Sequence, residues 1–197
     1  MRNPKEFLTD FITAAEFLHT RNRQALGDTI RYRTRWAVTR WNSEDDREQR
    51  LIYRPGLALE MFGHFPQFSL IPGNLMLNEG LNNLLTHICA ASGTKWDSGN
   101  AYLGVGTSSS AAAATDTGLV GTAVYKGMMA SFPTYGTSQK ATWKSEYLSA
   151  EANQAWEEYT LSNSNSNSGS NLNRKCSSQG TKSSGQVWEL TLDITFS

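Results

Sequence analysis

Hydrophobic positions follow two different periods along this chain, and each period predicts a different element. From Phe7 to Leu18 apolar side chains recur every three or four residues, which predicts an amphipathic helix. Asn3 and Pro4 precede it, and they are typical of an N-cap followed by the first helical position. From residue 30 to 39 apolar and polar positions alternate instead, which predicts a strand with one apolar and one basic face.

A second helix and a series of strands are predicted in the rest of the chain. Leu77, Leu81, Leu85 and Ile88 share one helical face between residues 75 and 92, and Gly93 is a suitable stop. Beyond it, short alternating segments are separated by turn residues, and the clearest of them covers residues 187–196. Five or more such strands favour a mainly β fold, a jelly-roll-like β-sandwich with an N-terminal helix, an extended arm and one further helix.

The patterns predict two domains with a boundary at residue 74. Residues 1–74 form an N-terminal helix and an Arg-rich docking arm, and residues 75–197 form a β-sandwich domain that opens with a helix. Within the arm, residues 43–46 predict a turn and residues 51–53 a returning strand. Because ordering a backbone costs about 1–2 kcal/mol per residue, the arm needs support from its own β-domain, a neighbouring copy or another protein.

Charge is balanced in number but not in position. The chain has 18 Lys+Arg and 18 Asp+Glu, and a net charge of zero argues against a general nucleic-acid binder. Ten of the 11 arginines nevertheless lie between Arg2 and Arg54. Residues 21–40 hold six arginines and one acidic residue, so any binding surface is expected in the arm.

Three interpretations fit the basic face of the arm strand, which carries Arg31, Arg33 and Arg35. Interleaved aromatic residues would suit a nucleic-acid surface, and the acidic residues downstream would suit a merely solvated face. The interpretation that we favour is a protein-docking strand, because arginine and tryptophan are enriched at interface hot spots. In that case Trp36 and Trp41 are expected to act as anchors beside the three arginines.

Arrangements that would carry catalysis or hold a metal are scarce. Glu16 and His19 are three apart on a predicted helix without a second pair of ligands, and Glu157 and Glu158 are adjacent in a strand, so their side chains diverge. The segment 103–109 contains two glycines, but it lacks the Gly-Lys-Ser/Thr ending of a phosphate-binding loop. We therefore expect no catalytic residue, no metal and no cofactor.

The sequence also predicts no membrane segment. It has no run of 18 apolar residues, and its N-terminus lacks the pattern of a signal peptide. We expect a soluble protein made in the cytoplasm.

From residue 77 onward the chain resembles virion structural proteins of tailed bacteriophages. The resemblance is carried in order by the helix 77–85, the strand 102–107, the small-residue loop 114–119, Trp156-Glu157-Glu158-Tyr159, Leu172-Asn173-Arg174-Lys175, the segment 180–185 and the strand 187–196. Proteins of this type are β-sandwich modules placed on a virion, either as head decoration (cement) proteins or as tail-associated, fibre-base proteins. The first 70 residues take no part in the resemblance.

The resemblance implies a non-enzymatic protein of the virion, assembled in the bacterial host cytoplasm. The first expectation is a decoration protein that binds the major capsid protein, with Arg31, Arg33 and Arg35 facing acidic capsid groups and Trp36 and Trp41 as anchors. By analogy it implies a homo-oligomer, a trimer, with no nucleic-acid or membrane partner. The alternative is a tail-associated or receptor-binding protein whose loops at 107–118 and 162–170 meet a host glycan. A third hypothesis, from the enzyme class, is a hydrolase that acts on cell wall or capsule.

Overall fold

The computed structural model of the chain describes residues 31–52 and 67–197, of which Tyr32–Phe196 form one compact unit. The helix predicted at residues 4–18 lies outside the described residues. The described part is mainly β with two helices. Its elements are β1 (Tyr32–Trp41), α2 (Glu44–Ile52), β2 (Gln67–Pro72), β3 (Leu75–Met76), α4 (Asn78–Ala90), β4 (Tyr102–Gly106), β5 (Ala123–Gly127), β6 (Thr134–Thr137), β7 (Lys140–Tyr147), β8 (Glu158–Ser162), β9 (Asn171–Cys176) and β10 (Val187–Phe196).

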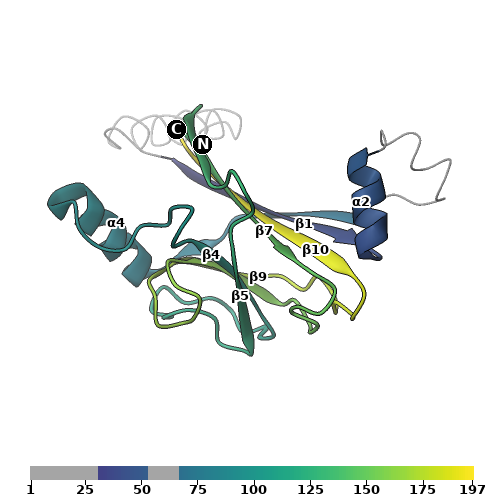
Figure 1. The fold of residues 1–197 in the computed structure, drawn as a ribbon. Coiled ribbons are helices and arrows are strands. Elements are labelled where there is room, and N and C mark those ends of the chain that lie inside the picture. The colour runs from purple at the N-terminus through teal and green to yellow at the C-terminus, as the bar shows by residue number, and fades with distance from the viewer. Residues whose placement is uncertain (1–30, 53–66) are drawn as a thin grey trace, which may run out of the picture. The chain divides into compact units, whose positions relative to one another are not determined.

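The strands form two antiparallel sheets of five, which pack as a sandwich (Figure 1). The order in the first, sheet A, is β2-β1-β10-β7-β6, and in the second, sheet B, it is β3-β9-β8-β4-β5. β1 and β10 have 10 residues each and pair along their whole length, with Trp36 opposite Leu192. The predicted mainly β sandwich is confirmed.

Aromatic side chains fill the space between the sheets. The rings of Tyr147 and Trp188 each pack against Trp156 with centroids 4.9 Å apart, and Trp36 packs on Tyr159 at 5.8 Å. Such tilted and edge-to-face pairs are favourable arrangements of aromatic rings. The Tyr147 hydroxyl on β7 also donates a hydrogen bond of 2.6 Å to the carbonyl oxygen of Leu103 on β4, so that it joins the two sheets.

One local prediction is wrong: the turn and returning strand expected at residues 43–53 are replaced by α2 up to residue 52. The Ser43 hydroxyl accepts a hydrogen bond of 3.0 Å from the backbone N–H of Asp46, which caps the helix. Three acidic residues in the first turn are favourable beside the positive end of the helix dipole. Two adjacent apolar residues, Leu51 and Ile52, are too short a segment to distinguish the spacing of a strand from that of a helix. In the structure they end α2.

The structure also differs from the predicted domain boundary at residue 74. β1 pairs with β10 on one side and β2 on the other, so residues 32–41 and 67–72 supply two of the five strands of sheet A. The apolar face of β1 completes the core, since Trp36 and Val38 are both fully buried. The described strands of the arm therefore lie on their own β-domain, one of the three supports that the entropy argument allowed.

The helix predicted between residues 75 and 92 is confirmed as α4. Its chain direction reverses at Ala91, which adopts the left-handed conformation with a φ of 48°, two residues before the expected Gly93. Figure 1 shows α4 projecting away from the two sheets. Neither helix in the described part of the chain is long and apolar enough to cross a membrane.

Candidate docking surface

The side chains of sheet A that point away from the core form a continuous surface, which we call the sheet-A outer face. Because directly opposed residues of an antiparallel pair share a face, the strand register defines its members. They include Arg33, Arg35, Ala37 and Thr39 on β1, Phe68, Leu70 and Pro72 on β2, Glu189, Thr191, Asp193 and Thr195 on β10, and Lys140, Thr142, Lys144 and Glu146 on β7.

Positive charge gathers at one end of this face around a single carboxylate. Asp193 lies 2.6 Å from the guanidinium of Arg35 and 2.9 Å from the Lys140 ammonium, and it accepts a hydrogen bond of 2.7 Å from Thr142. Burial acts to raise the pKa of Asp193, but the hydrogen bonds from Arg35, Thr142 and Lys140 outweigh it and hold the pKa below its ordinary value. Two cations meet this carboxylate, and the exposed Arg33 lies two residues from Arg35 on the same face, so this end of the face carries excess positive charge.

At the opposite end of the face, oppositely charged groups pair with one another. Lys144 lies 3.0 Å from Glu189, and Arg47 of α2 lies 2.5 Å from Glu146 of β7. The hydrogen bond to Glu146 raises the pKa of Arg47. Because these pairs leave little unbalanced charge, the excess positive charge of the face lies at the end that holds Arg33.

Two large apolar side chains lie on the same face along its edge strand. Phe68 and Leu70 of β2 are each more than half exposed, and the register places them beside Thr39 and Ala37 of β1. Exposed apolar side chains that adjoin arginines are the combination found where proteins bind other proteins. The sheet-A outer face therefore joins a basic end to an apolar edge.

The structure separates the five residues predicted to dock. Arg33 and Arg35 lie exposed on the sheet-A outer face, and Arg31, directly before β1, is also exposed. Trp36 is 0% exposed and belongs to the core between the sheets, whereas Trp41 is 9% exposed and its pairing with Val187 puts it on the other side of sheet A. An indole between the sheets cannot reach a partner without opening the sandwich, so the structure corrects the prediction that Trp36 is an anchor. The burial of Trp41 likewise leaves it little surface to offer a partner.

Sequence reasoning missed Phe68, Leu70, Lys140 and Asp193. Neither Phe68 nor Leu70 belongs to an element predicted from the sequence, although the two have the alternating spacing of a strand face. Asp193 was placed on the polar face of the last strand, but its neighbours on β1 and β7 follow only from the order of strands in the sheet.

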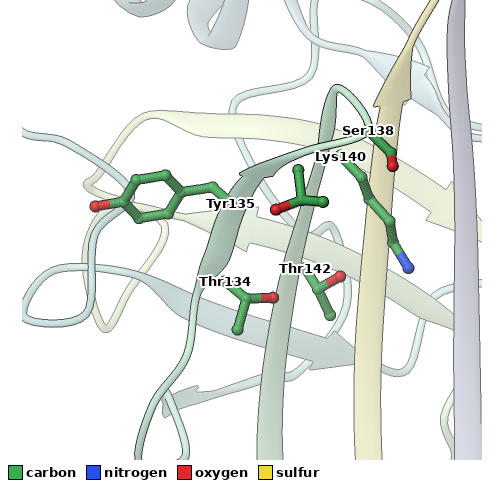
Figure 2. A pocket seen from close by; sticks show the side chains of 6 residues that line it. Thr134, Tyr135, Ser138, Lys140 and Thr142 are labelled. Carbon is green, nitrogen blue, oxygen red and sulfur yellow. The ribbon is translucent and has the colours of Figure 1, made fainter.

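A shallow hollow adjoins the basic end, at the hairpin of β6 and β7. It has a volume of about 310 Å³ and is lined by Thr134, Tyr135, Thr137, Ser138, Lys140 and Thr142. Figure 2 shows Thr134, Thr142 and Lys140 on one side of the hairpin, while the ring of Tyr135 points to the other. Lys140 and Thr142 are shared with the sheet-A outer face, so the hollow extends that surface beyond Asp193.

On the outer side of sheet B, a buried ion-pair network fixes the loop at 107–121. The Glu158 carboxylate is fully buried, lies 2.6 Å from Arg174 and accepts hydrogen bonds from the backbone N–H groups of Val120 (3.1 Å) and Gly121 (2.7 Å). Arg174 in turn lies 2.8 Å from Asp116. Burial acts to raise the pKa of Asp116, but hydrogen bonds from the Ala113 N–H and Arg174 leave it lowered.

Three of the segments that carry the phage resemblance meet at this network. Asp116 comes from the small-residue loop, Glu158 from the Trp-Glu-Glu-Tyr segment and Arg174 from the Leu-Asn-Arg-Lys segment. The neighbouring Glu157 accepts a hydrogen bond from Ser178 instead, so the two adjacent carboxylates diverge as predicted. With its carboxylate taken up by Arg174 and backbone N–H groups, Glu158 holds a loop in place.

The two loops expected to meet a glycan lie side by side. The Asn167 side chain donates to the carbonyl oxygen of Leu119 (2.8 Å) and accepts from its N–H (3.1 Å). Between the loops lies a hollow of about 330 Å³, lined by Thr115, Asp116, Thr117, Gly118, Leu119, Val120 and Asn167. Its lining includes two threonine hydroxyls, one carboxylate and one amide, which are groups of the kind that bind sugars.

Comparison with known proteins leaves these surfaces as the basis for any functional argument. No family model matches the chain, and no curated protein or solved structure is significantly similar to it. Within the residues that the structure describes, no group of three or more His, Cys, Asp or Glu side chains is placed to hold a metal ion. Cys89 and Cys176 are both free thiols.

Proposed function

We propose that the protein is a non-enzymatic structural component of a tailed-phage virion, a decoration (cement) protein that binds the major capsid protein and stabilises the shell. The observation that carries this proposal is the sheet-A outer face, which holds both exposed arginines and the exposed Phe68 and Leu70. Arginines on such a face suit acidic groups of a partner, and the apolar edge supplies contact area.

The scaffold behind this face favours docking. β1 lies between β2 and β10 and pairs with β10 along its whole length, so its arginines are presented by an ordered strand. A face that is ordered before binding loses less conformational entropy when it binds. On a capsid, many copies of a modest contact act together, and this multivalency would hold the shell.

Analysis of purified virions tests the proposed location directly. Quantitative mass spectrometry of particles from the phage that encodes this chain should find the protein at a copy number comparable to that of the major capsid protein. A low copy number would place it in the tail. Absence from purified particles would rule out the virion proposal altogether.

A binding measurement tests the docking face. Heads lacking the protein should bind the purified wild-type chain, and Arg31→Ala/Arg33→Ala should weaken this binding about tenfold, with a smaller dependence on salt. The matched control is Lys95→Ala/Lys175→Ala, which removes the same charge elsewhere and should bind like wild type. Equal binding by both double variants would exclude Arg31 and Arg33 from the interface.

A second candidate function is supported by the hollow between the loops at 107–118 and 162–170. In this case the protein is a tail-associated or receptor-binding component, and the hydroxyl- and amide-lined hollow beside Asn167 takes a host glycan. Binding of the purified chain to a glycan array, lost in Asn167→Ala but retained in Arg31→Ala/Arg33→Ala, would favour this function over the first.

A further inference from the structure

Helix α4 is attached to the sandwich by its first turn. Leu77 is fully buried, and the Glu79 carboxylate accepts a hydrogen bond of 2.6 Å from the backbone N–H of Asn171. At Gly80 the helix meets β9 so closely that a Cβ atom would lie 2.5 Å from the backbone of Leu172, which only glycine permits. The first turn therefore fixes the direction in which the rest of the helix projects (Figure 1).

The returning chain covers one side of the projecting part. Asn83 donates a hydrogen bond of 3.1 Å to the carbonyl oxygen of Thr94, and the His87 ring packs edge-on against Trp96 with centroids 6.0 Å apart. This side of α4 is polar and is already occupied by its own chain.

The opposite side is apolar and uncovered by the described residues. Leu81, Leu85 and Ile88 follow one another at spacings of four and three residues and are 41%, 57% and 71% exposed. Exposure thus increases toward the projecting end of the helix. A row with this spacing is the ridge that packs against another helix.

The charge of this region indicates the kind of partner. Residues 80–94 contain no Asp, Glu, Lys or Arg, so neither the row nor its margins carry a charge that a partner of opposite sign could meet. In paired helices, charged residues beside the apolar row attract or repel a given partner. Because residues 80–94 carry no such charge, two copies of this helix would not repel each other. An uncharged apolar row is also self-complementary, as symmetric association requires.

We propose that the α4 face formed by Leu81, Leu85 and Ile88 packs against α4 of a second copy of this chain. The association places two or more sheet-A outer faces in one assembly. It does not depend on the proposed function, because it involves no capsid protein and a different surface.

Sedimentation velocity of the full chain over a wide range of protein concentrations tests the proposal. Wild type should associate reversibly, and Leu85→Glu should weaken association at least about tenfold, because a charge would be buried between the helices. Leu85→Gln, which adds no charge, should weaken it less. Thr86→Glu is the matched control, since it places the same charge on the exposed polar side and should associate like wild type.

Circular dichroism should show all three variants folded, because position 85 lies outside the core. Two results would overturn the proposal. One is a wild-type chain that stays monomeric at every concentration. This result would overturn the proposal whether hydrogen exchange shows the amides of α4 to be open to solvent or protected by another segment of the same chain. The other is an oligomer that Leu85→Glu leaves intact.

Discussion

At the scale of single residues, buried charge in this protein serves to hold loops on sheets. Arg174 is 1% exposed, yet its guanidinium is met on two sides by Glu158 and Asp116 and donates to the carbonyl oxygens of Ser110 and Ala111. A buried ion pair of this kind is costly to break, because removing one charge leaves the other without compensation in a medium of low dielectric.

Glu158→Gln should therefore lower the free energy of unfolding by about 3 kcal/mol, since it leaves Arg174 buried with less opposing charge. Urea unfolding followed by tryptophan fluorescence measures the loss. Glu157→Gln is the control, because this side chain is not fully buried and, among the described residues, bonds only the Ser178 hydroxyl. Its effect should stay within about 0.5 kcal/mol. Equal effects of the two substitutions would contradict a structural role for the network.

At the scale of elements, Asp193 of β10 connects the three central strands of sheet A. It receives Arg35 from β1 and both Lys140 and Thr142 from β7, and these contacts lie on the outer face rather than in the core. Two of its partners are substantially exposed, so solvent screens part of the attraction. The contact still couples the strand register to the protonation of one carboxyl group.

The stability of the sheet should therefore depend on acid pH. The pKa of Asp193 is lower in the folded chain than its ordinary value of 3.8, so its contribution is present above that value and is lost as the pH falls through the folded-state pKa. Asp193→Asn should lower the free energy of unfolding at neutral pH by about 1–2 kcal/mol and make its decline below pH of about 4 shallower.

Urea titrations at a series of pH values measure this dependence. Asp97→Asn is a suitable control, because Asp97 is exposed and its hydrogen bonds within the described part of the chain all lie in its own turn. The assignment to Asp193 fails if Asp193→Asn and wild type lose stability in parallel as the pH is lowered.

At the scale of the whole molecule, sheet A is assembled from the two ends of the compact unit. β1 and β2 precede α4 in the chain, whereas β6, β7 and β10 follow it, and β1 and β10 meet at the centre of the sheet. A core built this way cannot be completed by residues 75–197 alone, because Trp36, Val38 and Ile71 would be missing from it.

A fragment of residues 75–197 should therefore fail to fold cooperatively, whereas residues 31–197 should unfold in a single cooperative transition. The shorter fragment exposes the edge of β10 and the apolar side chains that β1 covers, so it should also aggregate. Circular dichroism during urea titration compares the two. Cooperative unfolding of residues 75–197 would restore the boundary at residue 74.

The predictions from sequence succeeded where the pattern of one segment was sufficient. The alternation around Trp36 and along residues 187–196 identified the core-facing side chains of β1 and β10 correctly, and the spacing from Leu77 to Ile88 identified α4. The spacing could not show that the apolar row of α4 faces outward, because the spacing of apolar residues shows which face of a helix is apolar and does not show what covers that face.

The sequence by itself therefore determined the elements with strong periodicity, the β-rich class of the fold and the exposed arginines of β1. These follow from side-chain direction along a single strand or helix, which is a local property. Tertiary structure alone decided that Trp36 and Trp41 are buried, that Arg35 meets Asp193, 158 residues away, and that Phe68 and Leu70 join the same face. These contacts follow from the order of strands in sheet A, which the packing of the whole core sets.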